Sequence, residues 1–151
     1  MPLPIIIGKW AILYLKGIEE DLKNIPPDTD LNESLLRNCR SARVDCHREV
    51  ARILIELGRH HAARSHCEQV VDFSPNKHSY YQMGVVFFHI NELKKALSFF
   101  EKAKAECGGI DTSITRYLRQ CEQLIEAEES NKSPPDPRNV PQDRTDRSFS
   151  M

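Results

Sequence analysis

The chain has 151 residues, 40% of them hydrophobic and 28% charged, and a formal net charge of −1. This length and composition suit one soluble domain with a modest core, and the near-neutral charge excludes a general attraction to nucleic acid or to an anionic membrane surface. The five cysteines form no Cys-x-x-Cys pair, so we expect buried, reduced thiols rather than a zinc or redox motif.

The most apolar stretch of the chain runs from Leu3 to Ile18. It is shorter than the ~20 residues of a membrane span and contains Lys9 and Lys16. It also lacks the basic leader and the cleavage site of a signal peptide. We predict a buried helix over residues 5–24, which ends at Pro26–Pro27 because two prolines cannot continue a helix. The alternative is a membrane-tethered adaptor that uses this stretch as its anchor.

A second helical pattern follows the proline-containing loop. Apolar residues recur at helical spacing from Leu35 to Leu57 and stop at Gly58. The pattern predicts one helix of unusual length, or two nearly continuous helices.

Two segments of the chain repeat each other at an offset of 33 residues. Each copy places a small residue, a bulkier residue four positions later and a small or medium apolar residue three positions beyond that on one helical stripe. The segments before these stripes echo each other at the same offset, which predicts a helix, a turn and a second helix in each copy. The two triplets are Ala63, Cys67 and Val70, and Ala96, Phe100 and Ala103.

The last predicted helix covers residues 111–129. Gly108 and Gly109 end the preceding helix, and apolar residues from Ile114 to Ile125 give the next one an apolar face that would cap the open end of the stack. Residues 130–151 are rich in proline and charge, a composition that cannot bury enough surface to offset its ordering entropy. We predict a disordered tail there.

The 33-residue pattern resembles the tetratricopeptide repeat. The copy from about 77 to 110 matches the signature of that repeat well, except that Gly108 stands where proline is usual. The copy from about 44 to 76 matches it at Ala51, Ala63 and Pro75. The resemblance implies an all-α fold, in which residues 31–110 form two antiparallel helix hairpins of a right-handed α-solenoid and residues 111–129 form a capping helix.

A second resemblance concerns the first helix. Ala11, Leu15 and Ile18 have the spacing of the two triplets, so residues 1–30 are expected to form the second helix of an incomplete first repeat, plus a loop. The distance from Ala11 to Ala63 is 18 residues longer than the usual repeat of about 34. Such an insertion is similar to the junction between the first two repeats of FKBP-type immunophilin co-chaperones.

The chain contains no isomerase domain, so this resemblance implies a non-catalytic scaffold or adaptor of a co-chaperone-like kind. The alternative is a fragment or isoform of an FKBP-type peptidyl-prolyl isomerase that lacks its catalytic domain. The sequence offers no Ser-His-Asp arrangement, phosphate loop or distinctive carboxylate pair. We therefore expect no enzymatic activity and no cofactor.

In the tetratricopeptide class, the first helices of successive repeats line a concave groove that binds a protein or peptide. The arginines among the expected lining residues could converge on an acidic peptide. The lining residues are expected to be Arg48, Glu49, Arg52, Tyr81, Gln82, Phe88, His89, Arg116 and Arg119.

Co-chaperones of this class hold the terminal carboxylate of a heat-shock chaperone with lysine, asparagine and arginine. At three of the matching positions this chain has Glu49, His78 and Gln82, and Glu49 would repel a carboxylate. We predict that the carboxylate clamp does not operate, although a chaperone complex stays among the candidate partners.

Three further predictions concern metals, partners and location. His60, His61, His66 and Cys67 cluster in sequence, but the spacing from His61 to His66 is poor for one helical face and Cys67 occupies a packing position, so no metal is expected. The first helix lacks the other helix of its repeat and would therefore expose isoleucine and tryptophan side chains. Such exposure favours self-association. We expect no nucleic-acid or membrane partner, and a cytoplasmic location, with a nuclear one as the alternative.

Overall fold

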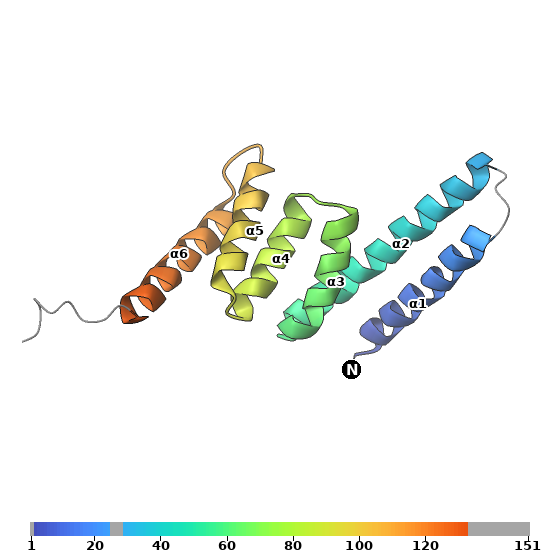
Figure 1. Ribbon diagram of the computed structural model, residues 1–151. Coiled ribbons are helices and arrows are strands. Elements are labelled where there is room, and N and C mark those ends of the chain that lie inside the picture. Colours follow the sequence, from blue (N-terminus) through green and yellow to red (C-terminus); the bar gives the residue numbers. More distant parts are fainter. Residues whose placement is uncertain (1, 25–28, 133–151) are drawn as a thin grey trace, which may run out of the picture.

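The computed structural model describes residues 2–24 and 29–132, and this part of the chain contains helices and no strand. Figure 1 shows the helices as a row in chain order, each packed against the next. The predicted all-α class is therefore confirmed. The helices are α1 (Leu3–Asn24), α2 (Thr29–Glu56), α3 (His60–Phe73), α4 (Lys77–His89), α5 (Leu93–Ala105) and α6 (Thr112–Lys132).

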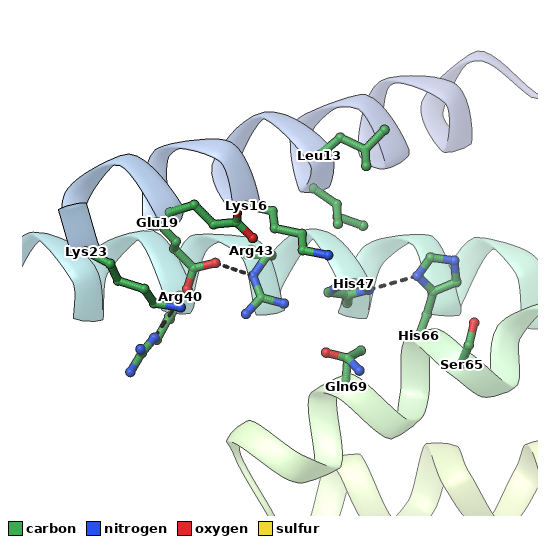
Figure 2. Close-up of a pocket in the computed structure, with 12 residues that line it drawn as sticks. Leu13, Lys16, Glu19, Lys23, Arg40, Arg43, His47, Ser65, His66 and Gln69 are labelled. Carbon is green, nitrogen blue, oxygen red and sulfur yellow. Dashed lines mark hydrogen bonds and ion pairs between the residues drawn. The ribbon is translucent and has the colours of Figure 1, made fainter.

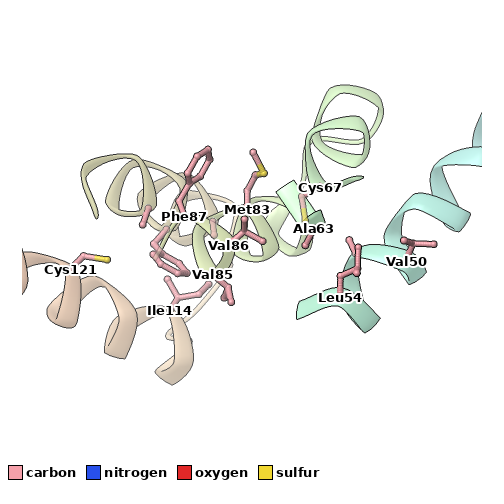
Figure 3. Packing of buried hydrophobic residues seen from close by; sticks show 14 of the residues in the cluster. Val50, Leu54, Ala63, Cys67, Met83, Val85, Val86, Phe87, Ile114 and Cys121 are labelled. Atoms are coloured by element: carbon pink, nitrogen blue, oxygen red, sulfur yellow. The ribbon is translucent and has the colours of Figure 1, made fainter. Parts of the chain in front are cut away.

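The two repeated triplets occupy equivalent core positions. All six side chains are buried, and Ala63, Ala96 and Phe100 have no exposed surface. A small residue at a helix crossing lets two backbones approach, while a large residue opposite fills the space between them. Figure 3 shows side chains of the stacked helices meeting in this core.

Gly84 shows how tightly α4 and α5 approach each other. A Cβ atom added at Gly84 would lie 2.8–2.9 Å from three ring carbons of Phe100. Only glycine leaves room for the ring at this crossing, because such distances lie inside van der Waals contact.

Local chain chemistry defines the turns and the helix starts. Gly58 and Asn91 adopt positive φ angles of 75° and 64° in the two turns between paired helices, and glycine and asparagine tolerate this conformation best. Asn76 begins α4 through a reciprocal capping box with Ser79. The Asp111 carboxylate accepts the Ser113 and Ile114 N–H groups at the start of α6.

The long helix and the capping helix can be compared with their predicted bounds. The long helix is a single one, α2, with 28 residues. The capping helix α6 continues to Lys132, three residues past the predicted end, and the Ser130 hydroxyl donates to the Glu126 carbonyl at 2.8 Å within this last part. The rest of the predicted disordered tail, residues 133–151, lies outside the described residues.

The prediction of a buried first helix is wrong for one face of α1. Only Ile5 and Glu19 of this helix are buried, whereas Trp10 is 66% exposed. The reason is that α1 packs on α2 and that, among the described residues, no helix covers its opposite side (Figure 1). Its apolar residues are therefore divided between a contact face and an open face.

Candidate protein-interaction surfaces

The expected groove arginines on α2 are held by carboxylates of the same helix. Arg48 Nη1 lies 2.6 Å from Asp45 Oδ1. Arg52 donates through Nε and Nη2 to Glu49, at 3.1 and 3.0 Å, and through Nη1 to Glu56 at 2.8 Å. The hydrogen bonds to Glu49, followed by its charge, raise the pKa of the Arg52 guanidinium. An incoming carboxylate would have to displace these partners.

Two of the expected groove residues on α4, Tyr81 and Phe88, belong to an aromatic cluster that joins α4, α5 and α6. Tyr117 of α6 stacks on Phe100 with ring centroids 4.9 Å apart. It meets Tyr81 and Phe88 edge-on, at 6.0 and 5.2 Å. Burial is the main cause that raises the pKa of Tyr81. Tyr81 and Phe88 thus support the capping helix while keeping part of their surface open.

The two remaining arginines lie together on α6. Arg116 is placed over the Tyr117 ring, 5.8 Å from its centroid, and Arg116 and Arg119 line a cavity of about 260 Å³. Figure 1 shows α2 and α6 at different positions along the row, with α3, α4 and α5 between them. The four arginines are therefore arranged as two pairs, and Arg116 of the α6 pair lies against Tyr117 of the aromatic cluster.

Gln82 and His89 complete the set on α4. Gln82 is half-buried, whereas His89 is exposed. The His89 ring stacks on His60 of α3, with centroids 4.2 Å apart and planes 16° apart. Burial, followed by the neighbouring His89, lowers the pKa of His60.

The sequence cluster of histidines and Cys67 does not form a metal centre. Among residues 2–24 and 29–132, no group of three or more His, Cys, Asp or Glu side chains is arranged to hold an ion. Cys67 lies in the core, where burial raises its pKa to about 12. Its thiol is therefore a packing group rather than a ligand or a nucleophile.

Sequence reasoning missed a histidine pair between α2 and α3. The Nδ1 atoms of His47 and His66 are 2.9 Å apart, so one ring donates to the other. Burial, then His66 and Arg43, lowers the pKa of His47 to about 4. His47 occupies the large-residue position of the repeat, and only the docking of α3 reveals its polar partner.

A buried carboxylate between α1 and α2 was missed as well. Glu19 has 6% of its side chain exposed, and its two oxygens lie 2.7 Å from Arg43 Nε and 3.3 Å from Arg40 Nε. A cavity of about 550 Å³ opens beside this ion cluster (Figure 2). The signal in the sequence was that Glu19 is the acidic residue of α1 at a position where the side chain turns inward.

Comparison with known proteins points to the same repeat. Residues 49–77 and 78–105 match the family model of the tetratricopeptide repeat. The two matched segments are therefore similar to tetratricopeptide repeats, and they overlap the predicted copies at about 44–76 and 77–110. No finding supports the finer immunophilin resemblance.

Two solved structures share the fold of the chain. The first TPR domain of human RPAP3, determined by NMR, is 17% identical with a TM-score of 0.53, covering 79% of this chain and 95% of that domain. The crystal structure of the Sgt2 TPR domain from Aspergillus fumigatus is 20% identical with a TM-score of 0.54, covering 85% of this chain and 93% of that one. At these identities the likeness concerns the fold, a tetratricopeptide-type α-solenoid.

The membrane-anchor alternative finds no support in the helices. Over the described ranges 2–24 and 29–132, none of the helices combines the length and the hydropathy required to cross a bilayer.

Proposed function

We propose that this protein is a non-catalytic adaptor that binds a segment of another protein along α4 and α6. The observation that carries the proposal is the aromatic cluster with its adjacent arginines. Tyr81 and Phe88 offer half-buried aromatic surface, and Arg116 and Arg119 are exposed beside a cavity. Aromatic residues and arginine are the side chains that contribute most to binding free energy at protein interfaces.

The partner segment should combine apolar anchors with acidic residues rather than end in a clamped carboxylate. Glu49 exposes a negative charge on α2 and occupies the donors of Arg52. A terminal carboxylate would have to share Arg52 with Glu49 and Glu56 and would meet a like charge. A chaperone complex of the kind implied by the immunophilin resemblance would then have to use a different mode of binding. The proposed location is the cytoplasm, with the nucleus as the alternative.

Selection from a displayed peptide library tests the proposed binding surface. Peptides selected on the wild-type protein should contain aromatic or aliphatic residues next to acidic ones. Calorimetry should then measure weaker binding to the Arg116→Glu and Arg119→Glu variants, by about tenfold each, because a charge-assisted hydrogen bond is replaced by repulsion. The control is Arg59→Glu, which makes the same charge change at an exposed residue before α3. Equal affinities for all four proteins would contradict the proposal.

We also propose that α1 mediates self-association, and that its open face is covered by α1 of a second copy. Leu3, Ile7, Trp10 and Tyr14 follow the four-three-four spacing of a coiled-coil seam and are each 56–68% exposed. Together with Ile6 and Leu13 they expose on the order of 700 Å², which is close to the ~800 Å² per partner of a standard interface.

Light scattering over a concentration series measures this association. The wild-type chain should be dimeric at tens of micromolar, and Trp10→Glu should make it monomeric because a charge would be buried in the seam. Leu124→Glu, at a residue of α6 that is 44% exposed, should leave the dimer intact. A wild-type monomer at these concentrations would refute the proposal, and sedimentation of that monomer with lipid vesicles would assign the α1 face to a membrane surface instead.

A further inference from the structure

The cavity of about 550 Å³ beside Glu19 lies between α1, α2 and α3. Its α2 residues, Arg40, Arg43 and His47, are on a different side of that helix from Arg48 and Arg52, since successive residues turn by about 100° around a helix. The cavity is lined by α1, α2 and α3 and is therefore separate from the binding surface proposed on α4 and α6, although it shares Leu13 with the open face of α1. Figure 2 shows its polar side chains projecting from all three helices around the same space.

The lining of this cavity carries more positive than negative charge. Lys16, Lys23, Arg40 and Arg43 face Glu19 and Glu20, which leaves a formal excess of two positive charges. The imbalance is not an effect of distant residues, because these six side chains all line the same cavity. A concave site with an uncompensated charge attracts ligands of the opposite sign.

Hydrogen-bond donors are available at the same place. Glu19 meets Arg40 and Arg43 at their Nε atoms, so the terminal nitrogens of both guanidinium groups are left for a further acceptor. Lys16 and Lys23 form no ion pair with the described residues. The forked guanidinium is the group that best fits a planar carboxylate or a phosphoryl oxygen pair.

The histidine pair forms part of the lining of the cavity. His47 and His66 both line it, and their 2.9 Å contact requires one ring to donate and the other to accept. Burial is the main cause that lowers the pKa of both rings, and the positive charges of Arg43 from α2 and Lys9 from α1 add to it. A bound anion would compensate those charges and make a second proton on the pair favourable.

We propose that this cavity binds an oxyanion, a phosphoryl or carboxylate group carried by a peptide of a protein partner. A volume of about 550 Å³ accommodates one such group with its neighbouring residues, since ligand cavities span roughly 300–1,000 Å³. The choice of a peptide as the carrier rests on the proposed adaptor function. The oxyanion site itself does not depend on it.

Titration of the full chain by NMR tests the oxyanion site. The probes are inorganic phosphate and two pentapeptides, Ala-Ala-X-Ala-Ala, in which X is phosphoserine or glutamate. Each bound probe should shift the His47 and His66 ring signals and raise their pKa, and binding should tighten as the pH falls from 7 to 6. Absence of these shifts at millimolar concentrations of all three probes would overturn the proposal.

Two charge reversals locate the site. Lys16→Glu should weaken phosphate binding about tenfold, because a cationic donor is lost and a repulsive charge is gained. Lys132→Glu changes the net charge equally at an exposed residue at the end of α6 and should leave binding unchanged. Equal weakening by both variants would reveal non-specific attraction and overturn the proposal.

Glu19→Gln separates an oxyanion site from a purely structural ion cluster. Removal of the competing carboxylate frees Arg40 and Arg43, so phosphate should bind several-fold tighter although the fold loses an ion pair. Unchanged or weaker phosphate binding by a folded Glu19→Gln variant would contradict the site. If this variant does not fold, the result for Lys16→Glu decides between the two possibilities.

Arg116→Glu should leave phosphate binding intact, so failure of the adaptor proposal can be recognised separately. Binding of phosphate without either peptide would refute the peptide carrier.

Discussion

The α4/α5 and α1/α2 hairpins both cross at a glycine, but they differ in what surrounds that crossing. In α4/α5, Gly84 faces the ring of Phe100 and the neighbouring positions are buried. In α1/α2, a Cβ added at Gly8 would collide with Cγ2 of Val50, yet farther along the helices the contact becomes polar at Glu19.

The two crossings have different surroundings because the helices that form them differ in length. The helices α4 and α5 have 13 residues each, so one crossing point and its neighbours account for most of their surface. The helices α1 and α2 have 22 and 28 residues and extend beyond the reach of the third helix of the stack. One core crossing can therefore position a hairpin whose remaining length is free for charged clusters, cavities and exposed apolar faces.

Removal of the aromatic ring at the α4/α5 crossing should have the largest effect on stability. Phe100→Ala should lower the free energy of unfolding by about 3–5 kcal/mol, because a fully buried ring is replaced by a cavity. Urea denaturation followed by circular dichroism measures the loss. The control Phe73→Ala, at a side chain that is 44% exposed, should cost far less, and similar losses for both would show that the repeat core does not dominate stability.

Acid should weaken the α2/α3 contact through His47. Its folded-state pKa of about 4 lies below the ~6.5 of the unfolded chain, so the unfolded chain binds more protons between these values. This contribution to stability is complete above pH 6.5 and is lost as the pH falls toward 4. At pH 4.5 the loss from this group should be about 2–3 kcal/mol.

A His47→Leu variant isolates this effect. Its stability, measured by urea denaturation at pH 7 and 4.5, should fall less on acidification than that of the wild type. Replacement of the exposed His78 by glutamine should keep the full wild-type loss. A His47→Leu variant with the wild-type pH dependence would exclude His47 as the source.

Gly8→Ala tests whether the α1/α2 crossing is as tight as the repeat crossing. The added methyl group would meet Val50, and overpacking should cost about 1–2 kcal/mol after the helical preference of alanine is allowed for. In a Val50→Ala background the same change should cost little, since the obstructing methyl group is absent. A double-mutant cycle from thermal or urea unfolding measures this coupling, and additive effects would contradict the close approach.

Gly17→Ala is the reference for Gly8→Ala, because it makes the same change at an uncrowded position of α1, and its effect should be the smallest. A Cβ at Gly17 would have no neighbouring atom within 4 Å, and alanine is the better helix former. The variant should therefore be more stable than the wild type by about 0.5–1 kcal/mol in urea denaturation. Destabilisation would mean that this part of α1 has a contact beyond α2.

Much of the repeat region could be predicted from the sequence because its contacts are periodic. The spacing of Ala63, Cys67 and Val70 specifies a helical stripe, and its recurrence at Ala96 predicts an equivalent packing site. The turn at Gly58 was equally legible, since a positive φ angle favours glycine. The partners of Arg48 and Arg52 were not predicted, although they lie three or four residues away on the same helix, because this spacing permits an exposed ion pair without requiring one.

By itself, the sequence determined the helical repeats, their boundaries to within a few residues and the small-to-large packing at their crossings, since these depend on local periodicity. Only the tertiary structure decided that His47 meets His66, that Glu19 bridges Arg40 and Arg43, and that a basic cavity opens beside them. These contacts join residues 19 to 24 positions apart or lie between three helices. Their geometry depends on how the helices α1, α2 and α3 pack against one another, and no local pattern encodes that packing.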